Sequence, residues 1–254
     1  MPLLDRDGTN IYYEVAGPED GRTPLLLTHG YSASGQMWTG NLPALTKERQ
    51  VITWDIRGHG RSDSPDDPSR YSEALSVEDM AALLDLLGAE QAVIGGLSLG
   101  GYLSLAFHLR YPERVAALVL CDTGPGYRRD EPRAGWNAMV ARTADNFEQR
   151  GLDGLGSSAE VVASQHRSAT GLARAARGIL AQHDARVIDS LPAIPVPTLV
   201  LVGADDAPFL GAADYMAGKI PGATKVVLAG AGHAANIDQP QAFDQALLAF
   251  LDSL

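Results

Sequence analysis

Ser98 could act as a nucleophile, because the stretch Gly96-Leu97-Ser98-Leu99-Gly100 fits the pattern Gly-x-Ser-x-Gly. The apolar run 91–94 predicts a buried strand before it, and residues 102–109 predict a buried helix after it. A serine in such a turn presents its hydroxyl, and small neighbours let the strand and helix pass closely. Many serines between glycines only form a turn, but the flanking elements favour a reactive one. The amide of Leu99 opens the predicted helix, so it can donate to an oxyanion.

A base and an acid must accompany such a serine, because a hydroxyl is a weak nucleophile until its proton is removed. Three further turns follow apolar runs that predict strands, and they contain His29 to Tyr31, Asp205 with Asp206, and His233. In an open parallel sheet, active groups collect at the carboxyl ends of the strands. These turns therefore offer a backbone donor, an acid and a base, in the chain order serine, aspartate, histidine.

The elements that must position these turns alternate along the chain. Apolar runs at 25–28, 51–55 and 115–121 predict strands, and the segments between them carry apolar residues at helical spacing. Such alternation predicts right-handed βαβ units and a parallel sheet covered by helices on both faces. The strand pattern stops after residue 124 and resumes at 198–202, so a helical insertion is expected between them.

Length and composition narrow the classes of protein. With 254 residues, the chain is long enough for one large domain with a sizeable core. Its net charge of −11 argues against nucleic acid or an anionic membrane as the main partner. The single cysteine, Cys121, allows no internal disulfide. Charge near the first residues and the lack of an apolar run of about 18 residues predict a cytoplasmic protein without a leader or membrane span.

The sequence also predicts a turn near residue 20 and lacks the usual patterns of metal and nucleotide sites. The glycine, proline and acidic residues at 17–21 predict a turn. No group of His, Cys and acidic residues has the spacing of metal ligands, and no glycine-rich phosphate loop follows a strand. We therefore expect no metal, no cofactor, a small-molecule substrate as partner, and a monomer or homodimer.

The turns together resemble those of an α/β-hydrolase with a helical cap, in particular the branch of 3-oxoadipate enol-lactone hydrolases and related small carboxylesterases. The matching segments are His29-Gly30-Tyr31, Asp55 to Ser62, the turn at Ser98, Gly203 to Asp206, and Gly232-His233. The resemblance covers nearly the whole chain and is weakest in the cap. It implies an α/β-hydrolase fold with a mostly parallel sheet, a core at 1–124 and 192–254, and a helical cap inserted at 125–191.

The resemblance also implies the catalytic roles. Ser98 would be the nucleophile and His233 the base, since an imidazole both accepts and returns a proton near neutral pH. The family spacing Gly-x-x-Asp places the acid on Asp206. Asp205 is the close alternative, because the proline that usually follows comes early in this chain. Asp122 is a third candidate, for which capping a turn is the favoured interpretation.

The oxyanion hole would consist of the backbone N–H groups of Tyr31 and Leu99. Loss of one such donor typically costs about 2.7–4 kcal/mol of transition-state stabilisation. His29 is interpreted as a structural hydrogen bonder and His59 as part of a loop with an architectural role, rather than as bases.

The pocket is expected to lie under the cap. Candidate substrate-binding residues are Trp38, Trp136 and Met139, although such a stripe as Trp136 and Met139 more often forms the cap's own core. The arginines at 128, 129 and 133 could attract a substrate carboxylate, although a solvated run of charge explains them as well.

The sequence therefore predicts a cofactor-free serine hydrolase that cleaves carboxylic esters or lactones through an acyl-enzyme on Ser98. The same three groups could instead support perhydrolysis of the haloperoxidase type or hydrolysis of a carbon–carbon bond. The alternative that is not primarily an enzyme is a ligand sensor with slow turnover. Epoxide hydrolases and haloalkane dehalogenases are disfavoured, because the similar folds of those enzymes carry aspartate at the position of Ser98.

Overall fold

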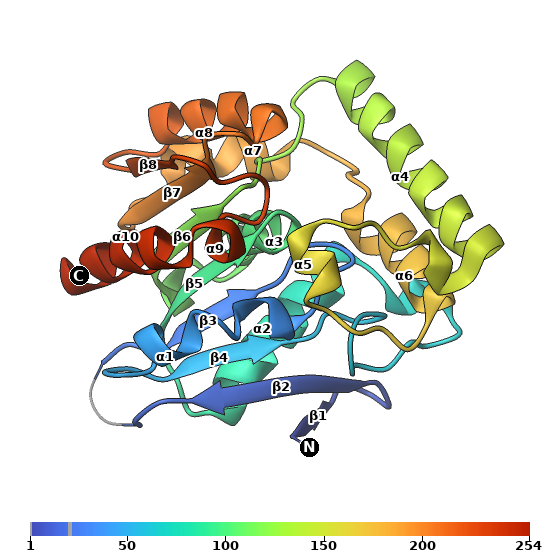
Figure 1. The fold of residues 1–254 in the computed structure, drawn as a ribbon, viewed down its shortest axis with the longest axis horizontal. Helices are drawn as coiled ribbons and strands as arrows, with labels where there is room; N and C mark the ends of the chain where they lie inside the picture. Colours follow the sequence, from blue (N-terminus) through green and yellow to red (C-terminus); the bar gives the residue numbers. More distant parts are fainter. Residues whose placement is uncertain (1, 20–21) are drawn as a thin grey trace.

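Eight strands form one sheet in the order β1-β2-β4-β3-β5-β6-β7-β8 in the computed structural model, which describes residues 2–19 and 22–254 (Figure 1). The strands are β1 (Leu3–Asp5), β2 (Asn10–Ala16), β3 (Leu25–Thr28), β4 (Val51–Trp54), β5 (Ala92–Leu97), β6 (Val115–Cys121), β7 (Thr198–Gly203) and β8 (Thr224–Leu228). The pairs β1–β2 and β2–β4 are antiparallel, and all other pairs are parallel. The turn predicted at 17–21 includes residues 20 and 21, which lie outside the described residues.

The register of the parallel strands brings their carboxyl ends to one edge. Thr28 pairs with Gly96, Leu97 pairs with Cys121, and Gly203 pairs with Leu228. The turns that follow these strands therefore emerge side by side, as the sequence predicted for the turns that carry Ser98, Asp206 and His233.

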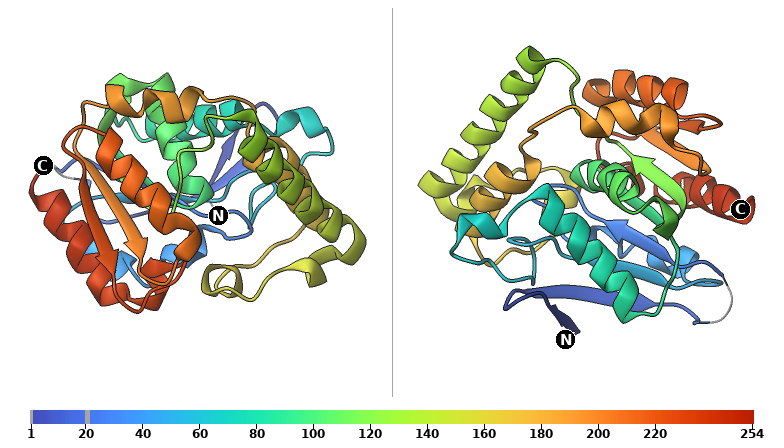
Figure 2. Two further views of the ribbon diagram at one scale, coloured as in Figure 1. Left: turned by 90° about the horizontal axis from the view of Figure 1, so that it is seen from above. Right: turned by 180° about the vertical axis from the view of Figure 1, so that it is seen from behind.

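Alternate residues of the strands point to two separate layers of core, because successive side chains of a strand face opposite sides of the sheet. Leu26, Ile94 and Leu118 belong to a cluster that packs under α2 (Glu73–Leu86), α3 (Leu99–Arg110) and α8 (Ala207–Lys219). Leu27, Val93 and Val119 belong to the cluster on the other face, which is covered by η1 (Gly35–Trp38), α1 (Leu42–Leu45) and α10 (Pro240–Asp252). The view from above in Figure 2 shows α10 and α3 on opposite sides of the strands. The fold is thus a mostly parallel sheet with helices on both faces, as predicted.

The regular secondary structure between β6 and β7 is all helical. It contains α4 (Asp130–Arg150), α5 (Ala159–Val162), α6 (Ala169–Ala175) and α7 (Arg186–Ser190), together with the short helices η4 (Gly151–Gly154), η5 (Ala176–Leu180) and η6 (Leu191–Ala193). Figures 1 and 2 show α4 and α5 projecting beyond the carboxyl edge of the sheet.

This helical segment has two parts that pack differently. Val140, Phe147 and Leu172 form a small core between α4 and α6. Val187 and Ile188 of α7 instead join the main core beneath α3, so α7 is part of the layer that covers the sheet. The remaining short helices are η2 (Pro68–Arg70), η3 (Pro112–Arg114) and α9 (Ala235–Asp238).

Candidate active site

Ser98 occupies a strained turn between β5 and α3. Its backbone has φ 55° and ψ −114°, a conformation that side chains rarely adopt and that costs on the order of 1–3 kcal/mol. The amide of Ser98 donates to the carbonyl of Cys121 at 2.9 Å, which ties the turn to the neighbouring strand. The hydroxyl thus stands at the carboxyl edge of the sheet.

The glycines on either side of Ser98 make this turn sterically possible. A Cβ atom on Gly96 would lie 2.6 Å from the carbonyl oxygen of Thr28, and one on Gly100 would lie 2.2 Å from the same oxygen. Strand β3 therefore passes too close to the turn for any larger residue at either position. The predicted close passage of β5 and α3 is also present, because the same Cβ atom on Gly96 would lie 2.5 Å from the backbone carbonyl carbon of Gly100.

His233 and Asp206 form a hydrogen-bonded pair between the turns after β8 and β7. The Nδ1 of His233 lies 2.8 Å from the Oδ2 of Asp206. The Asp206 side chain is only 4% exposed, whereas Asp205 points to solvent. Of the two adjacent aspartates, the structure brings only Asp206 to the histidine.

Nearby charge acts on the imidazole of His233. Burial by itself works to lower the pKa of His233, but the hydrogen bond and charge of Asp206, with the charges of Asp122 and Glu160, raise it above its ordinary value. The ring of Phe209 stacks on His233, with ring centroids 4.8 Å apart. These contacts fix the plane of the ring and favour its charged form.

Asp122 lies beside this pair but bonds to backbone. Its Oδ1 accepts from the amide of Gly203 at 2.7 Å, and its Oδ2 accepts from the amide of Ala235 at 3.4 Å. The side chain is fully buried, and burial raises the pKa of Asp122 to about 7. Asp122 therefore joins the end of β7 to the turn that carries His233, and no hydrogen bond connects it to the imidazole within the described residues.

Glu160 brings a cap carboxylate towards the same region. Helix α5, which carries Glu160, packs against α9, which follows His233. The side chain is buried, and its Oε1 accepts from the hydroxyl of Ser158 at 2.6 Å. Its Oε2 has no hydrogen-bond partner in the described part of the chain.

The two amides predicted for an oxyanion hole are free to donate. Leu99 is the first residue of α3, and Tyr31 lies in the turn after β3. Neither N–H donates to another group among residues 2–19 and 22–254. The hydroxyl of Tyr31 donates to the carbonyl of Leu172 at 2.8 Å, which holds this turn against helix α6 of the cap.

The histidines near this turn serve as packing and hydrogen-bonding groups. The Nε2 of His29 accepts from the amide of Ile56 at 2.9 Å, and its Nδ1 lies 2.6 Å from the carbonyl of Gly30. Burial lowers the pKa of His29 to about 3, so its ring is neutral. His59 is also buried, and its ring packs edge-on against Tyr31. Both arrangements agree with the structural roles predicted from the sequence.

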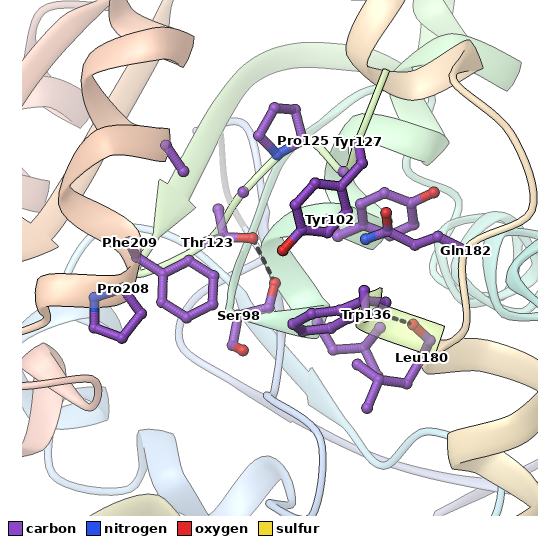
Figure 3. Close-up of a pocket in the computed structure, with 14 residues that line it drawn as sticks. Ser98, Tyr102, Thr123, Pro125, Tyr127, Trp136, Leu180, Gln182, Pro208 and Phe209 are labelled. Carbon is purple, nitrogen blue, oxygen red and sulfur yellow. Dashed lines mark hydrogen bonds between the residues drawn. The ribbon is translucent and has the colours of Figure 1, made fainter. Parts of the chain in front are cut away.

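A cavity of about 280 Å³ opens on Ser98 (Figure 3). On one side it is bounded by Pro208, Phe209 and Ala212 of α8, and on the other by Trp136, Leu180 and Gln182 of the cap. Its remaining lining is Leu99, Tyr102, Thr123, Gly124, Pro125, Gly126 and Tyr127. Its volume is near the lower end of the range of about 300–1,000 Å³ that is common for ligand pockets.

Only one of the three predicted substrate-binding residues lines this cavity. Trp136 does, and its indole N–H donates to the carbonyl of Leu180 at 3.0 Å. The prediction for Trp38 was wrong, because η1 turns this fully buried side chain to the face of the sheet covered by α10, where it packs against Phe243. Met139 also does not line the cavity, because it packs against the small core between α4 and α6.

Sequence reasoning missed several residues of the cavity. Phe209 follows Asp206 by three residues in the first turn of α8, and Pro125 belongs to the turn after β6. Both could have been found from their place at strand ends. Gln182 lies past η5 without a motif, and only the tertiary structure brings it to Ser98.

The arginines considered for a substrate carboxylate are engaged elsewhere or exposed. Arg128 donates to Asp189 at 2.7 Å. Arg133 pairs with Asp130 and donates to the carbonyl of Tyr127 at 3.1 Å. Arg129 is exposed, and none of the three lines the cavity.

Clusters of metal ligands and helices that could span a membrane do not occur in the described part of the chain. Residues 2–19 and 22–254 contain no cluster of three or more His, Cys, Asp or Glu side chains arranged to hold a metal ion. No helix among them combines the length and apolar character needed to cross a bilayer.

Comparisons with known proteins agree with the geometry. The family model described as alpha/beta hydrolase fold matches residues 23–169. The 3-oxoadipate enol-lactonase 1 of Acinetobacter baylyi is 26% identical over 99% of this chain and 97% of its own length. A hydrolase of Pseudomonas aeruginosa has a solved structure with a TM-score of 0.80 and 31% identity, covering 98% of this chain and 97% of that one. A thermophilic esterase of Thermogutta terrifontis aligns with a TM-score of 0.82 and 30% identity, over 99% and 96%.

Proposed function

Because this chain belongs to the alpha/beta hydrolase fold family, we propose that it is a serine hydrolase that cleaves carboxylic esters or lactones. The observation that carries the proposal is the hydrogen bond between Asp206 and His233 at the sheet edge that also presents Ser98. A nucleophile, a base and a carboxylate that orients the base are the groups this chemistry requires, so no cofactor is needed.

In the proposed first half-reaction, the Ser98 hydroxyl attacks the substrate carbonyl while His233 takes its proton. With Nδ1 bonded to Asp206, Nε2 is the nitrogen available to accept it. Asp206 holds the tautomer and stabilises the imidazolium. The negative oxygen of the tetrahedral intermediate faces the amides of Tyr31 and Leu99. The intermediate then collapses, the C–O bond breaks, and His233 returns the proton to the leaving alkoxide.

In the second half-reaction, water hydrolyses the ester formed on Ser98. His233 removes a proton from the water as the water attacks the acyl carbon. The second tetrahedral intermediate releases the carboxylic acid, and the proton passes from His233 back to Ser98. Atoms and charge are then restored, and the net reaction consumes one water.

Labelling and turnover together test the proposal. Wild-type protein should react with a fluorophosphonate at Ser98 and hydrolyse 4-nitrophenyl acetate and butyrate. Ser98→Ala should lose the label and at least about a thousandfold in kcat. The exposed Ser69 offers a matched control, since Ser69→Ala should retain both properties.

The outcomes separate the alternatives. If folded Ser98→Ala kept its esterase activity, the proposed nucleophile would be wrong. Labelling without ester turnover would instead favour one of the alternatives: perhydrolysis with peroxide as the acyl acceptor, hydrolysis of a carbon–carbon bond, or a ligand sensor with slow turnover. A cytoplasmic location and a monomeric or homodimeric state stay predictions from the sequence.

A further inference from the structure

The described lining of the cavity beside Ser98 carries no formal charge. None of the fourteen described residues that line it is Asp, Glu, His, Lys or Arg. The nearby Arg133 donates to the backbone of Tyr127 from outside and is paired with Asp130. A carboxylate placed in this cavity would therefore lose water and meet no cationic side chain among the described lining residues, which is unfavourable.

Helix α4 holds the polar residue of this cavity in place. The side-chain amide of Asn137 donates to the carbonyl of Gln182 at 2.7 Å, and its oxygen accepts from the amide of Gln182 at 2.9 Å. The neighbouring Trp136 donates to the carbonyl of Leu180. Three hydrogen bonds thus clamp the backbone of residues 180–182, so the Gln182 side chain is presented from a fixed segment.

The Gln182 side-chain amide has no partner among the residues that the structure describes. The side chain is 8% exposed, and its Oε1 is buried without a hydrogen bond in the described part of the chain. This oxygen lies against Gly126, where a Cβ atom would come within 2.8 Å of it. The Nε2 end of the planar amide therefore faces away from Gly126, and within the described residues it donates to no other group.

Two other side-chain hydroxyls of the cavity, those of Tyr102 and Thr123, are already committed, whereas the hydroxyl of Tyr127 has no hydrogen-bond partner among the described residues. The hydroxyl of Tyr102 donates to Glu73 at 2.8 Å, and the hydroxyl of Thr123 donates to the carbonyl of Ser98 at 2.6 Å. Gln182 differs from Tyr127 because it is buried, so its side-chain amide is an unpartnered buried polar group among mostly apolar walls. Buried polar groups usually have a partner, so such a group indicates a place for a ligand atom.

We propose that Gln182 selects substrates whose group in this cavity is small, uncharged and equipped with a neutral oxygen that accepts a hydrogen bond from Nε2. This inference rests on the proposed function, because it concerns the same site. It assigns Gln182 a role in specificity and excludes substrates with a carboxylate in the cavity. The net charge of −11 acts in the same direction, because it disfavours the approach of anions.

Three arylboronic acids test this inference by direct calorimetric titration. In each, the boron can bond to the Ser98 oxygen, and the aryl ring with its single substituent is meant to occupy the cavity. The probes are phenylboronic acid, 4-carbamoylphenylboronic acid and 4-carboxyphenylboronic acid. For the wild type, we expect the carbamoyl compound to bind about 3- to 10-fold tighter than the parent, as one neutral hydrogen bond allows. The carboxy compound should bind at least about 10-fold more weakly than the parent.

Two variants locate the preference. Gln182→Leu keeps the size of the residue and should abolish the advantage of the carbamoyl compound over the parent compound. The exposed Gln165, also in the cap segment, offers a matched control, and Gln165→Leu should bind all three as the wild type does. Comparing the same three probes across variants cancels their electronic differences.

The inference is overturned if Gln182→Leu keeps the carbamoyl advantage, or if the carboxy compound binds wild type as tightly as the parent. A Ser98→Ala arm tests the proposed function separately. If phenylboronic acid binds Ser98→Ala as tightly as wild type, no bond to Ser98 forms and the nucleophile is wrong. The comparison with Gln182→Leu would still decide the preference of the cavity.

Discussion

The Nδ1 of His233 and the Oδ2 of Asp206 lie 2.8 Å apart, although 27 residues separate them in the chain. Each side chain leaves a turn at the end of one of two neighbouring parallel strands, β7 and β8. The register of these strands therefore sets the distance between the two groups. Asp205 leaves the same turn but faces solvent.

We expect Asp206→Asn to reduce kcat for 4-nitrophenyl acetate by about 10²- to 10⁴-fold, because an amide no longer fixes the tautomer of His233 or stabilises its charged form. Asp205→Asn should stay within about twofold of wild type, since exposed changes away from special features have small effects. Steady-state kinetics on both variants, with circular dichroism to verify folding, makes the comparison. The reverse ranking would move the acid to Asp205.

The pH profile should reflect the raised pKa of His233. The base must be neutral, so activity should fall as pH drops through a pKa above the ordinary value of the imidazole. Burial opposes this shift, while Asp206, Asp122 and Glu160 produce it. Glu160→Gln removes one negative charge, which lowers the pKa of His233 and moves the acidic limb of kcat/KM to lower pH.

A pH series of kcat/KM between about pH 5 and pH 9 measures this limb. Glu131 is exposed on α4, so Glu131→Gln removes one negative charge from a solvent-exposed position of the cap. It should leave the acidic limb of kcat/KM unchanged. An unchanged limb in Glu160→Gln would show that the cap carboxylate does not act on His233.

Two glycines should respond to alanine in opposite ways. Gly100→Ala places a Cβ atom 2.2 Å from the carbonyl oxygen of Thr28, so we expect a loss of at least about 3 kcal/mol in the free energy of unfolding. Gly211 lies in α8, where a Cβ atom would meet no described atom within 4 Å, so Gly211→Ala should gain roughly 0.5–1 kcal/mol. Urea unfolding measures both, and a stable Gly100→Ala would contradict the tight crossing of β3.

The buried ion pair of Arg57 and Asp79 should be sensitive to neutralisation. The Nε of Arg57 lies 2.6 Å from Oδ2 of Asp79, and both side chains are almost fully buried. Asp79→Asn should cost about 3–5 kcal/mol in the free energy of unfolding, because the guanidinium is left uncompensated. Asp85→Asn breaks an exposed pair with Arg114 and should cost at most about 1 kcal/mol. Equal losses in the two variants would show that burial does not govern this pair.

The positions of the parallel strands and the turn at Ser98 were predictable because their causes are local. Apolar runs and helical spacing mark the elements, and Gly96 and Gly100 mark the place where β5 and α3 pass closely across the turn at Ser98. The helical insertion was predictable for the same reason, since strand patterns stop between β6 and β7. The packing of α7 on α3 was not, because apolar spacing does not say which neighbour a helix covers.

The sequence by itself determined the order of strands and helices and the turns that hold Ser98, Asp206 and His233, because periodicity, glycine spacing and turn chemistry act between near neighbours. The tertiary structure alone decided that Asp206 rather than Asp205 meets the imidazole, that Trp38 lies in the core, and that Gln182 reaches the cavity. These outcomes depend on which way a side chain points and on which distant segment lies opposite, and strand register and helix packing set both.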